Sequence, residues 1–333
     1  MLLNELGEFG FIERFSKKYF HKPLKDGFLG IGDDCAVLPE DAKSETLVST
    51  DLLIENVHFI KDEIGGFQLG KKSLAVNLSD LAASGAEPCA SFLSLGLPKN
   101  TSVEFMDEFF KGYAFLSEKY NCPLLGGDTT KSPENLVINV TVLGKAKKNA
   151  KKLRSMAKPG DVICVTGVLG NSAAGLEFLL NKNLKRDENA RYLIDYHHNP
   201  QPRVLEGMFL ASLEGVNAMT DISDGISSDL KHIMKLSQVS AVIETDKLPI
   251  SKELEENSNF GYTQKRQFAL SGGEDYELLL TVDIKKFAAV NEAYFKKFGK
   301  KLYQIGTIKN GFSDEIFFTE NMFLTNGFDH FSA

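Results

Sequence analysis

The sequence has 333 residues, of which 43% are hydrophobic and 25% charged, and its formal net charge is −7. Such a length and composition predict a soluble globular protein with two domains. The net negative charge argues against a nucleic-acid-binding surface. No apolar run is long enough for a membrane helix, and the acidic residues Glu5, Glu8 and Glu13 argue against a signal peptide. We therefore expect no membrane partner and a cytoplasmic location.

The cysteines and histidines exclude several kinds of site. Four cysteines lie far apart without a C-x-x-C pair, and the six histidines form no H-x-x-x-H pair. Neither a zinc site nor a disulfide framework is indicated, so we expect reduced cysteines in the core.

Strand-like and helical patterns alternate through the first half of the chain. The predicted elements are strand 46–49, helix 67–84, strand 90–95, helix 102–119 and strand 136–142. Ser102 is expected to cap the second helix, because a serine hydroxyl accepts hydrogen bonds from the first free N–H groups.

A lysine-rich segment, 144–152, and the turn residues 158–161 separate the two halves. We place the boundary near residue 146, giving domains 1–146 and 147–333. The second half is predicted to contain helices 172–182, 187–197, 203–213, 226–236 and 284–298, and strands 162–166, 240–245 and 276–282. This alternation favours an α/β fold.

Acidic residues recur at short junctions that contain glycine or serine. The junctions are Gly32-Asp33-Asp34, Ser49-Thr50-Asp51, Leu78-Ser79-Asp80, Gly126-Gly127-Asp128-Thr129-Thr130, Asp221-Ile222-Ser223-Asp224-Gly225 and Gly272-Gly273-Glu274-Asp275. Most follow an apolar run, where loops place functional groups on a rigid scaffold. Gathered carboxylates repel one another unless divalent cations bridge them, and Mg²⁺ is commonly shared with substrate phosphates. The pattern predicts a Mg²⁺–nucleotide site.

Each junction also has a structural interpretation. Ser49-Thr50-Asp51 is predicted to end a strand and bind a hard cation. Asp80 interrupts an apolar helix face, so it is either buried with a partner or exposed. Asp33 and Asp34 alone would be typical of a turn.

The glycine-containing junctions leave similar alternatives. In 126–130 the glycines allow a backbone to approach an anion, but a tight turn is the alternative. In 221–229 the acids favour metal and phosphate, unless Asp224 or Ser227 is simply a helix N-cap. Three acids in 274–277 favour contact with a polar substrate group.

Two segments resemble phosphate loops only in part. The segment 65–72 matches G-x-x-x-x-G-K, but Lys72 stands where a serine or threonine must hold Mg²⁺. A helix start is the better interpretation. The segment from Gly30 has Cys35 at the third glycine position of a dinucleotide fingerprint. His58 alone is typical of a structural residue.

Taken in order, these junctions resemble the thiamine-monophosphate kinase family. The match includes Gly7-Glu8-Phe9, 30–36, 49–58, 75–82, 126–130, 221–225, 271–278 and the ending 327–331. The family is related to aminoimidazole ribonucleotide synthetase. The resemblance implies a two-domain α/β (α+β) fold and a homodimer. The N-terminal domains would form a shared barrel and bind metal and ATP, and the C-terminal domain would complete the site.

The resemblance also assigns roles to residues. It implies Mg²⁺ ligands at Asp34, Ser49, Thr50, Asp51, Asp80, Asp128, Asp221 and Asp224, of which Asp51, Asp80, Asp128 and Asp224 are the catalytic set. Nucleotide contacts would come from Gly127, Asp128, Arg154 and Ser223. Thiamine monophosphate would contact His58, Glu274 and Phe328, the last in place of a frequent tyrosine.

The implied reaction is transfer of the γ-phosphoryl group of ATP to thiamine monophosphate. The acceptor is already an anionic phosphate oxygen, so positioning and charge neutralisation by Mg²⁺ suffice, in a direct in-line transfer. Another enzyme of the superfamily, similar to aminoimidazole ribonucleotide synthetase, is the alternative. A catalytically silent nucleotide-binding sensor is a third interpretation.

Overall fold

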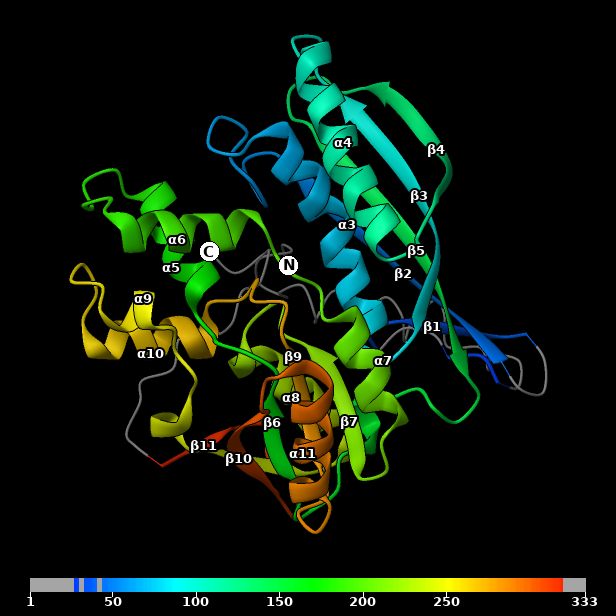
Figure 1. The fold of residues 1–333 in the computed structure, drawn as a ribbon, viewed down its shortest axis with the longest axis vertical. Coiled ribbons are helices and arrows are strands. Elements are labelled where there is room, and N and C mark those ends of the chain that lie inside the picture. Colours follow the sequence, from blue (N-terminus) through cyan, green and yellow to red (C-terminus); the bar gives the residue numbers. More distant parts are fainter. Residues whose placement is uncertain (1–26, 30–32, 41–43, 320–333) are drawn as a thin grey trace, which may run out of the picture.

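Two β-sheets with helices packed on them make up the described chain, which comprises residues 27–29, 33–40 and 44–319 of a computed structural model (Figure 1). The first sheet has the strand order β1-β2-β5-β3-β4. Its strands are β1 (Ala36–Pro39), β2 (Ser44–Ile54), β3 (Glu87–Leu97), β4 (Leu124–Lys131) and β5 (Val137–Lys147). β4 runs parallel to β3, and the other neighbours are antiparallel.

Alternating side chains divide the first sheet into a buried face and an open face. Leu93 and Val140 lie on the buried face, whereas Phe92 is exposed on the open face. The helices α3 (Gly66–Ala83) and α4 (Val103–Lys119) belong to the buried side.

Glycines let α3 and α4 pack closely. A Cβ atom at Gly112 would lie 1.9 Å from the Phe67 carbonyl oxygen, and one at Gly70 would lie 1.9 Å from the Phe109 carbonyl oxygen. Larger residues at these two positions would force the helices apart.

The second sheet has the order β11-β8-β10-β6-β9-β7. Its strands are β6 (Val162–Val165), β7 (Val216–Asp221), β8 (Ser240–Ile243), β9 (Leu278–Val282), β10 (Tyr303–Lys309) and β11 (Phe317–Phe318). Both faces are covered, because Val162 and Cys164 belong to one core cluster and Ile163 and Val165 to another. Strands buried on two faces have continuous apolar sequences, as β6 and β9 do.

The remaining helices surround the second sheet and join it to the first. They are α5 (Asn171–Leu180), α6 (Glu188–His198), α7 (Val204–Ser212), α8 (Ile226–Ser237), α9 (Lys252–Glu255), α10 (Tyr262–Ser271) and α11 (Phe287–Phe298), with 3-10 turns at Arg154–Met156 and Thr245–Lys247. α3 and α7 lie between the sheets in Figure 1. A Cβ atom at Gly207 of α7 would lie 2.1 Å from the Ala82 carbonyl oxygen of α3. One core cluster therefore extends across both halves.

The structure confirms most elements that the sequence predicts. Helix α3 begins at Gly66, as the helix-start interpretation of 65–72 requires, and the Ser102 hydroxyl accepts a hydrogen bond from the Phe105 N–H at the start of α4. The sequence did not predict strands β1, β4, β7, β10 and β11 or helices α9 and α10.

The four cysteines are free thiols, with Cys89 half-buried and the others buried. Within the described residues, no helix has both the length and the hydropathy of a membrane span.

Candidate active site

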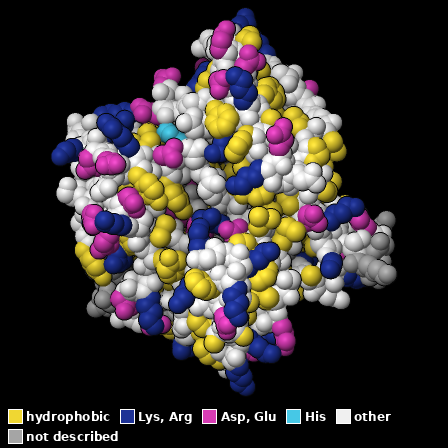
Figure 2. All heavy atoms as spheres, viewed as in Figure 1, with side chains coloured by type: hydrophobic (Ala, Val, Ile, Leu, Met, Phe, Trp, Pro, Cys, Tyr) yellow, Lys and Arg dark blue, Asp and Glu magenta, His cyan; other side chains and the backbone are white. Residues whose placement is uncertain are grey.

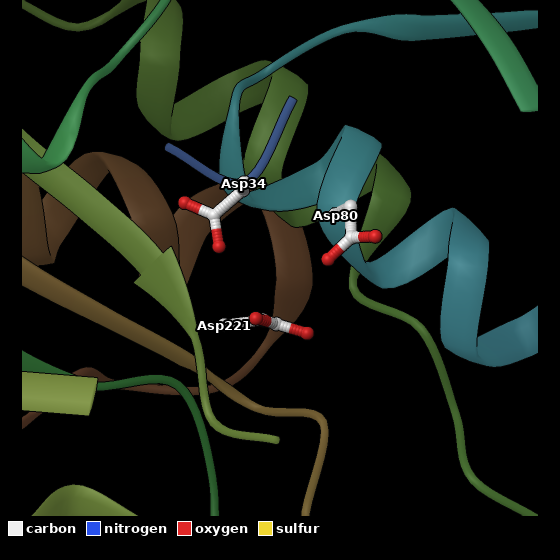
Figure 3. A group of neighbouring side chains, drawn as sticks. All are labelled: Asp34, Asp80 and Asp221. Atoms are coloured by element: carbon white, nitrogen blue, oxygen red, sulfur yellow. The ribbon is translucent and has the colours of Figure 1, made fainter. Parts of the chain in front are cut away.

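Three aspartates from distant parts of the chain face one another where the two halves meet. Asp34 precedes β1, Asp80 lies on α3, and Asp221 ends β7 (Figure 3). Each offers one carboxylate oxygen, and these oxygens lie within 4.8 Å of one another. The cluster confirms that three of the acidic junctions converge.

β2 contributes two further polar groups beside Asp80. The Ser49 hydroxyl donates a hydrogen bond to the Asp80 carboxylate. The Asp51 N–H donates to Asn77 Oδ1 of α3 at 3.0 Å. The prediction that 49–51 ends a strand is wrong, because β2 continues to Ile54 through its pairing with β5. The functional side chains thus project from the middle of a strand toward a helix.

Burial and mutual repulsion change the charge of this cluster. Burial raises the pKa of Asp51 to about 6, and burial followed by Asp34 raises that of Asp221 to about 8. The pKa of Asp80 is raised by burial and by Asp51, Asp221 and Asp34. Asp34 Oδ2 and Asp221 Oδ2 are buried without a hydrogen-bond partner among the described residues. Orphaned carboxylate oxygens are suitable ligands for a hard divalent cation.

Arg154 adds one positive charge at the edge of the cluster. Its Nη2 lies 2.7 Å from Asp34 Oδ1, its Nε donates to Thr220 at 3.2 Å, and its N–H donates to Asp33 at 3.1 Å. Burial lowers the pKa of Arg154, but Asp34 and Asp229 raise it above its ordinary value. This ion pair compensates the charge of Asp34.

The loop between β7 and α8 brings more acids to the same region. Asp224 donates its N–H to Asp229 Oδ2 at 3.2 Å, and Asp229 is buried. Asp229, three residues after the first residue of α8, is not among the site residues predicted from the sequence. Gly225 is the N-cap of α8, so the interpretation of Asp224 or Ser227 as the cap is wrong.

Thr50 and Asp128 lie apart from the cluster. The Thr50 hydroxyl bonds to Thr141 Oγ1 at 2.9 Å, on the open face of the first sheet. Asp128 lies on the same face, because it pairs with Ser94 of β3, and Ser94 pairs with Asn139 of β5. Ser49 and Asp51 face the opposite side, so the expected single oxygen cluster at 49–51 is wrong.

The segment 126–130 is neither a loop nor a tight turn. It lies inside β4, the edge strand, and all eight residues of β4 are exposed. A hollow of about 500 Å³ is lined by Phe110 of α4, by Leu93 and Leu95 of β3, and by 124–129. This hollow lies beside the segment 126–130, which the sequence predicts to approach an anion. Its lining does not include Asp34, Asp80 or Asp221.

Glu274 lies in a tightly folded loop before β9. Its N–H donates to the Ser223 carbonyl at 2.7 Å, and both Glu274 and Tyr276 have positive φ. Such backbone conformations are rare outside glycine and occur at functional sites. The loop places Ser223 and Glu274 side by side.

The other two acids of this loop have structural roles. Asp275 Oδ2 accepts from the Gly170 N–H at 2.8 Å, and Glu277 is buried against the Arg203 guanidinium, with Nε to Oε2 at 2.8 Å. The prediction that three acids meet a polar substrate group is therefore wrong for Asp275 and Glu277.

His58 follows β2, and its Nδ1 accepts a hydrogen bond from the Ile54 N–H at 3.0 Å. This bond fixes the ring, as the structural interpretation expected. Phe328 lies outside the described residues, as do the motifs at 7–9 and 327–331.

Comparisons with known proteins show which family the chain belongs to. Family models described as AIR synthase related protein match residues 32–146 (N-terminal domain) and 158–318 (C-terminal domain). The thiamine-monophosphate kinase of Buchnera aphidicola subsp. Acyrthosiphon pisum is 41% identical over 97% of this chain and 98% of its own. The chain belongs to the thiamine-monophosphate kinase family.

Other members of the thiamine-monophosphate kinase family give similar values. The Salmonella typhimurium relative is 39% identical over 98% of this chain and 99% of its own. The solved structure "AaThiL complexed with AMPPCP and TMP" has a TM-score of 0.85 and 32% identity, and the match covers 99% of both chains. The two-domain α/β fold is therefore that of a thiamine-monophosphate kinase.

Proposed function

We propose that this protein transfers the γ-phosphoryl group of ATP to thiamine monophosphate, producing thiamine diphosphate and ADP. The observation that carries the proposal is the convergence of Asp34, Asp80 and Asp221 between the two halves of a chain of this family. Buried carboxylates in this number are suited to metal-bound phosphates.

Mg²⁺ is the cation we assign to the cluster, where it would neutralise charge on the transferring phosphoryl group. Asp34, Asp51, Asp80 and Asp221 would hold it together with Ser49 and Asp224. The orphaned oxygens of Asp34 and Asp221 support this assignment. Thr50 and Asp128 share the open face and would form a separate oxygen group there.

The nucleotide would lie against Arg154 and Ser223, whereas Gly127 and Asp128, also predicted as nucleotide contacts, lie on the edge strand β4 away from this group. Arg154 supports this role because its guanidinium is buried beside the cluster and stays protonated. Thiamine monophosphate would contact His58 and Glu274, with Phe328 covering its aromatic end. Glu274 supports this role because its side chain is 25% exposed and its backbone is held by its loop.

The chemistry needs no general base, because the attacking oxygen belongs to an anionic phosphate. We propose direct in-line transfer, in which the residues orient two phosphates and exclude water. No residue of the chain becomes phosphorylated in this scheme.

A homodimer that shares a barrel fits the exposed edge of the first sheet. β4 is an open edge strand with Leu124 and Leu125 exposed, and Phe110 is exposed beside it. Figure 2 shows hydrophobic side chains on this part of the surface. Such an edge normally pairs or is covered. The proposed domains, 1–146 and 147–333, would then divide dimerisation from completion of the substrate site.

Competing acceptors test the reaction. Purified protein is incubated with ATP, Mg²⁺ and one of three acceptors: thiamine monophosphate, thiamine, or formylglycinamidine ribonucleotide, which is the acceptor of an aminoimidazole ribonucleotide synthetase. Chromatography should show thiamine diphosphate and ADP in equal amounts with the first acceptor only. Turnover of the ribonucleotide alone would favour the superfamily alternative, and no turnover with any acceptor would favour the sensor.

The Asp51→Asn variant tests the role of the cluster in that reaction. It should lose at least about a hundredfold in kcat, since charge stabilisation of a transition state typically contributes this much. Asp107→Asn, at an exposed site on α4, is the matched control and should retain activity. Unchanged kcat in Asp51→Asn would remove Asp51 from the catalytic set.

A further inference from the structure

Lys72 is a fully buried lysine on α3 whose ammonium reaches the second half of the molecule. It is 0% exposed, and its Nζ lies 3.1 Å from Oε1 and 3.1 Å from Oε2 of Glu274. Burying an ammonium is costly unless a carboxylate is placed against it. The segment 65–72, which matches a phosphate loop only in part, therefore ends in a lysine that forms an ion pair with a carboxylate of the second half.

Lys72 is the source of positive charge at this carboxylate. His197 Nδ1 lies 3.3 Å from Glu274 Oε2 and 2.9 Å from the Ser172 hydroxyl. Burial and then Lys72 lower the pKa of His197 well below its ordinary value, and the same causes lower that of His198 to about 4. Both imidazoles are neutral near pH 7, so neither adds positive charge beside Glu274.

The loop fixes the backbone of Glu274 but not the direction of its side chain. Glu274 has φ of 53°, and its N–H is held by the Ser223 carbonyl at 2.7 Å. Its side chain is 25% exposed, so one side of the carboxylate remains open. Lys72 spans both oxygens from the buried side and so determines which direction the open side faces.

The same helix carries a residue of the aspartate cluster. Lys72 and Asp80 are eight residues apart on α3, which corresponds to about 12 Å along a helix axis at 1.5 Å per residue. Because Lys72 contacts Glu274 and Asp80 belongs to the cluster, α3 sets the distance between Glu274 and the aspartates. That spacing suits a molecule with a phosphate at one end and a cationic heteroaromatic group at the other.

We propose that Lys72 is a positioning residue for thiamine monophosphate, acting through Glu274. This inference rests on the proposed function, in which Glu274 contacts the thiamine end. Lys72 orients the Glu274 carboxylate from its buried side, and α3 sets its distance from the aspartates that bind the phosphate end. Lys72 itself contacts no reacting atom.

A double-mutant cycle tests the proposal, with Lys72→Met, Glu274→Gln and the combined variant. The dissociation constant for thiamine monophosphate is measured by calorimetry, and KM for each substrate and kcat are measured alongside. Lys71→Met is the matched control, because Lys71 is the neighbouring lysine on α3 and bonds to Asn199 Oδ1 at 3.1 Å.

Lys72→Met should weaken thiamine monophosphate binding by about tenfold or more, the range for losing a charged hydrogen bond. The KM for ATP should change by less than about twofold, and Lys71→Met should leave both values near the wild type. In the Glu274→Gln background, Lys72→Met should add almost nothing, because the residue it acts through is already altered.

If the fold-changes in the dissociation constant caused by Lys72→Met and Glu274→Gln multiply in the combined variant, the two residues act independently. That result would overturn the positioning role of Lys72 and leave Glu274 as a substrate ligand. Unchanged binding in Glu274→Gln would overturn both this inference and the Glu274 assignment, even if kinase activity persists. If Lys72→Met does not fold, the comparison of Glu274→Gln with the combined variant, which leaves no unpaired charge, gives the same decision.

Discussion

Replacing Asp221 by asparagine should stabilise the metal-free protein while weakening its response to Mg²⁺. The change keeps the size of the side chain and removes a carboxyl group that the folded, metal-free protein holds protonated at pH 7. In the folded protein, burial and then Asp34 raise the pKa of Asp221 from 3.8 to about 8. The folded state therefore binds a proton that the unfolded state has lost, and the stability from this group falls as pH rises from about 4 to about 8.

The size of the effect follows from the same pKa. At pH 7, the proton uptake costs up to about 4 kcal/mol, at about 1.4 kcal/mol per pH unit above 3.8. Asparagine needs no proton, but its buried amide loses about 1–3 kcal/mol if it lacks partners. The net gain should be about 1–3 kcal/mol at pH 7. The gain at pH 7 should exceed that at pH 5 by about 2–3 kcal/mol, because the amide cost cancels in the difference.

Urea unfolding at pH 5, 6 and 7 in EDTA measures these gains. Repeating the titrations with Mg²⁺ should stabilise the wild type more than the variant, since a ligand of the folded state stabilises by RT ln(1 + [L]/Kd). Asp107→Asn, on the exposed surface, is the control for a simple change of net charge. An Asp221→Asn protein that is less stable than wild type in EDTA at every pH would refute the reasoning, since the aspartate would then be a structural residue.

Three further predictions concern packing and charge. Asp275→Asn should flatten the decline of stability between pH 4 and 8, because burial raises the Asp275 pKa to about 8, and a variant whose pH profile matches the wild type would contradict this. Glu277→Gln should cost about 1.5–3 kcal/mol in urea unfolding, because the partly buried Arg203 loses its close carboxylate partner and keeps only the longer ion pair to Glu206 at 3.9 Å, and a loss below about 1 kcal/mol would show that the Glu277–Arg203 pair is dispensable. Gly112→Ala should cost about 1–3 kcal/mol by forcing α4 from α3, whereas Gly261→Ala, which meets nothing within 4 Å, should be neutral or slightly stabilising; equal effects would contradict the close helix contact.

The sequence allowed the elements with strong local signals to be predicted. Helix α4 is an example, because Ser102 and a 3.6-residue apolar period define it without any tertiary information. Strand β7 was not predicted, because Val216–Asp221 mixes polar and apolar residues without a strand-like pattern. These residues are buried because the strand pairs within the second sheet. Exposed β4 was interpreted as a loop, because its two glycines and hydroxyl residues have low strand preference.

The site shows the same limit. The convergence of Asp34, Asp80 and Asp221 was expected from acids at junctions, and the structure confirms it. Which face a side chain occupies was not predicted: Thr50 and Asp51 are neighbours in sequence but project to opposite sides of β2, because strand side chains alternate. The pairing of Lys72 with Glu274 joins residues 202 positions apart, and no local pattern indicates such a contact.

Crystals grown with Mn²⁺ and a non-hydrolysable ATP analogue test the central claim most directly, because Mn²⁺ takes oxygen ligands like Mg²⁺ and is visible by anomalous scattering. We expect at least one anomalous peak within about 2.5 Å of carboxylate oxygens of Asp34, Asp80 and Asp221, bridged to the nucleotide phosphates. A nucleotide ordered against Arg154 and backbone N–H groups, with no peak at the three aspartates, would contradict a site built from metal-bridged acids.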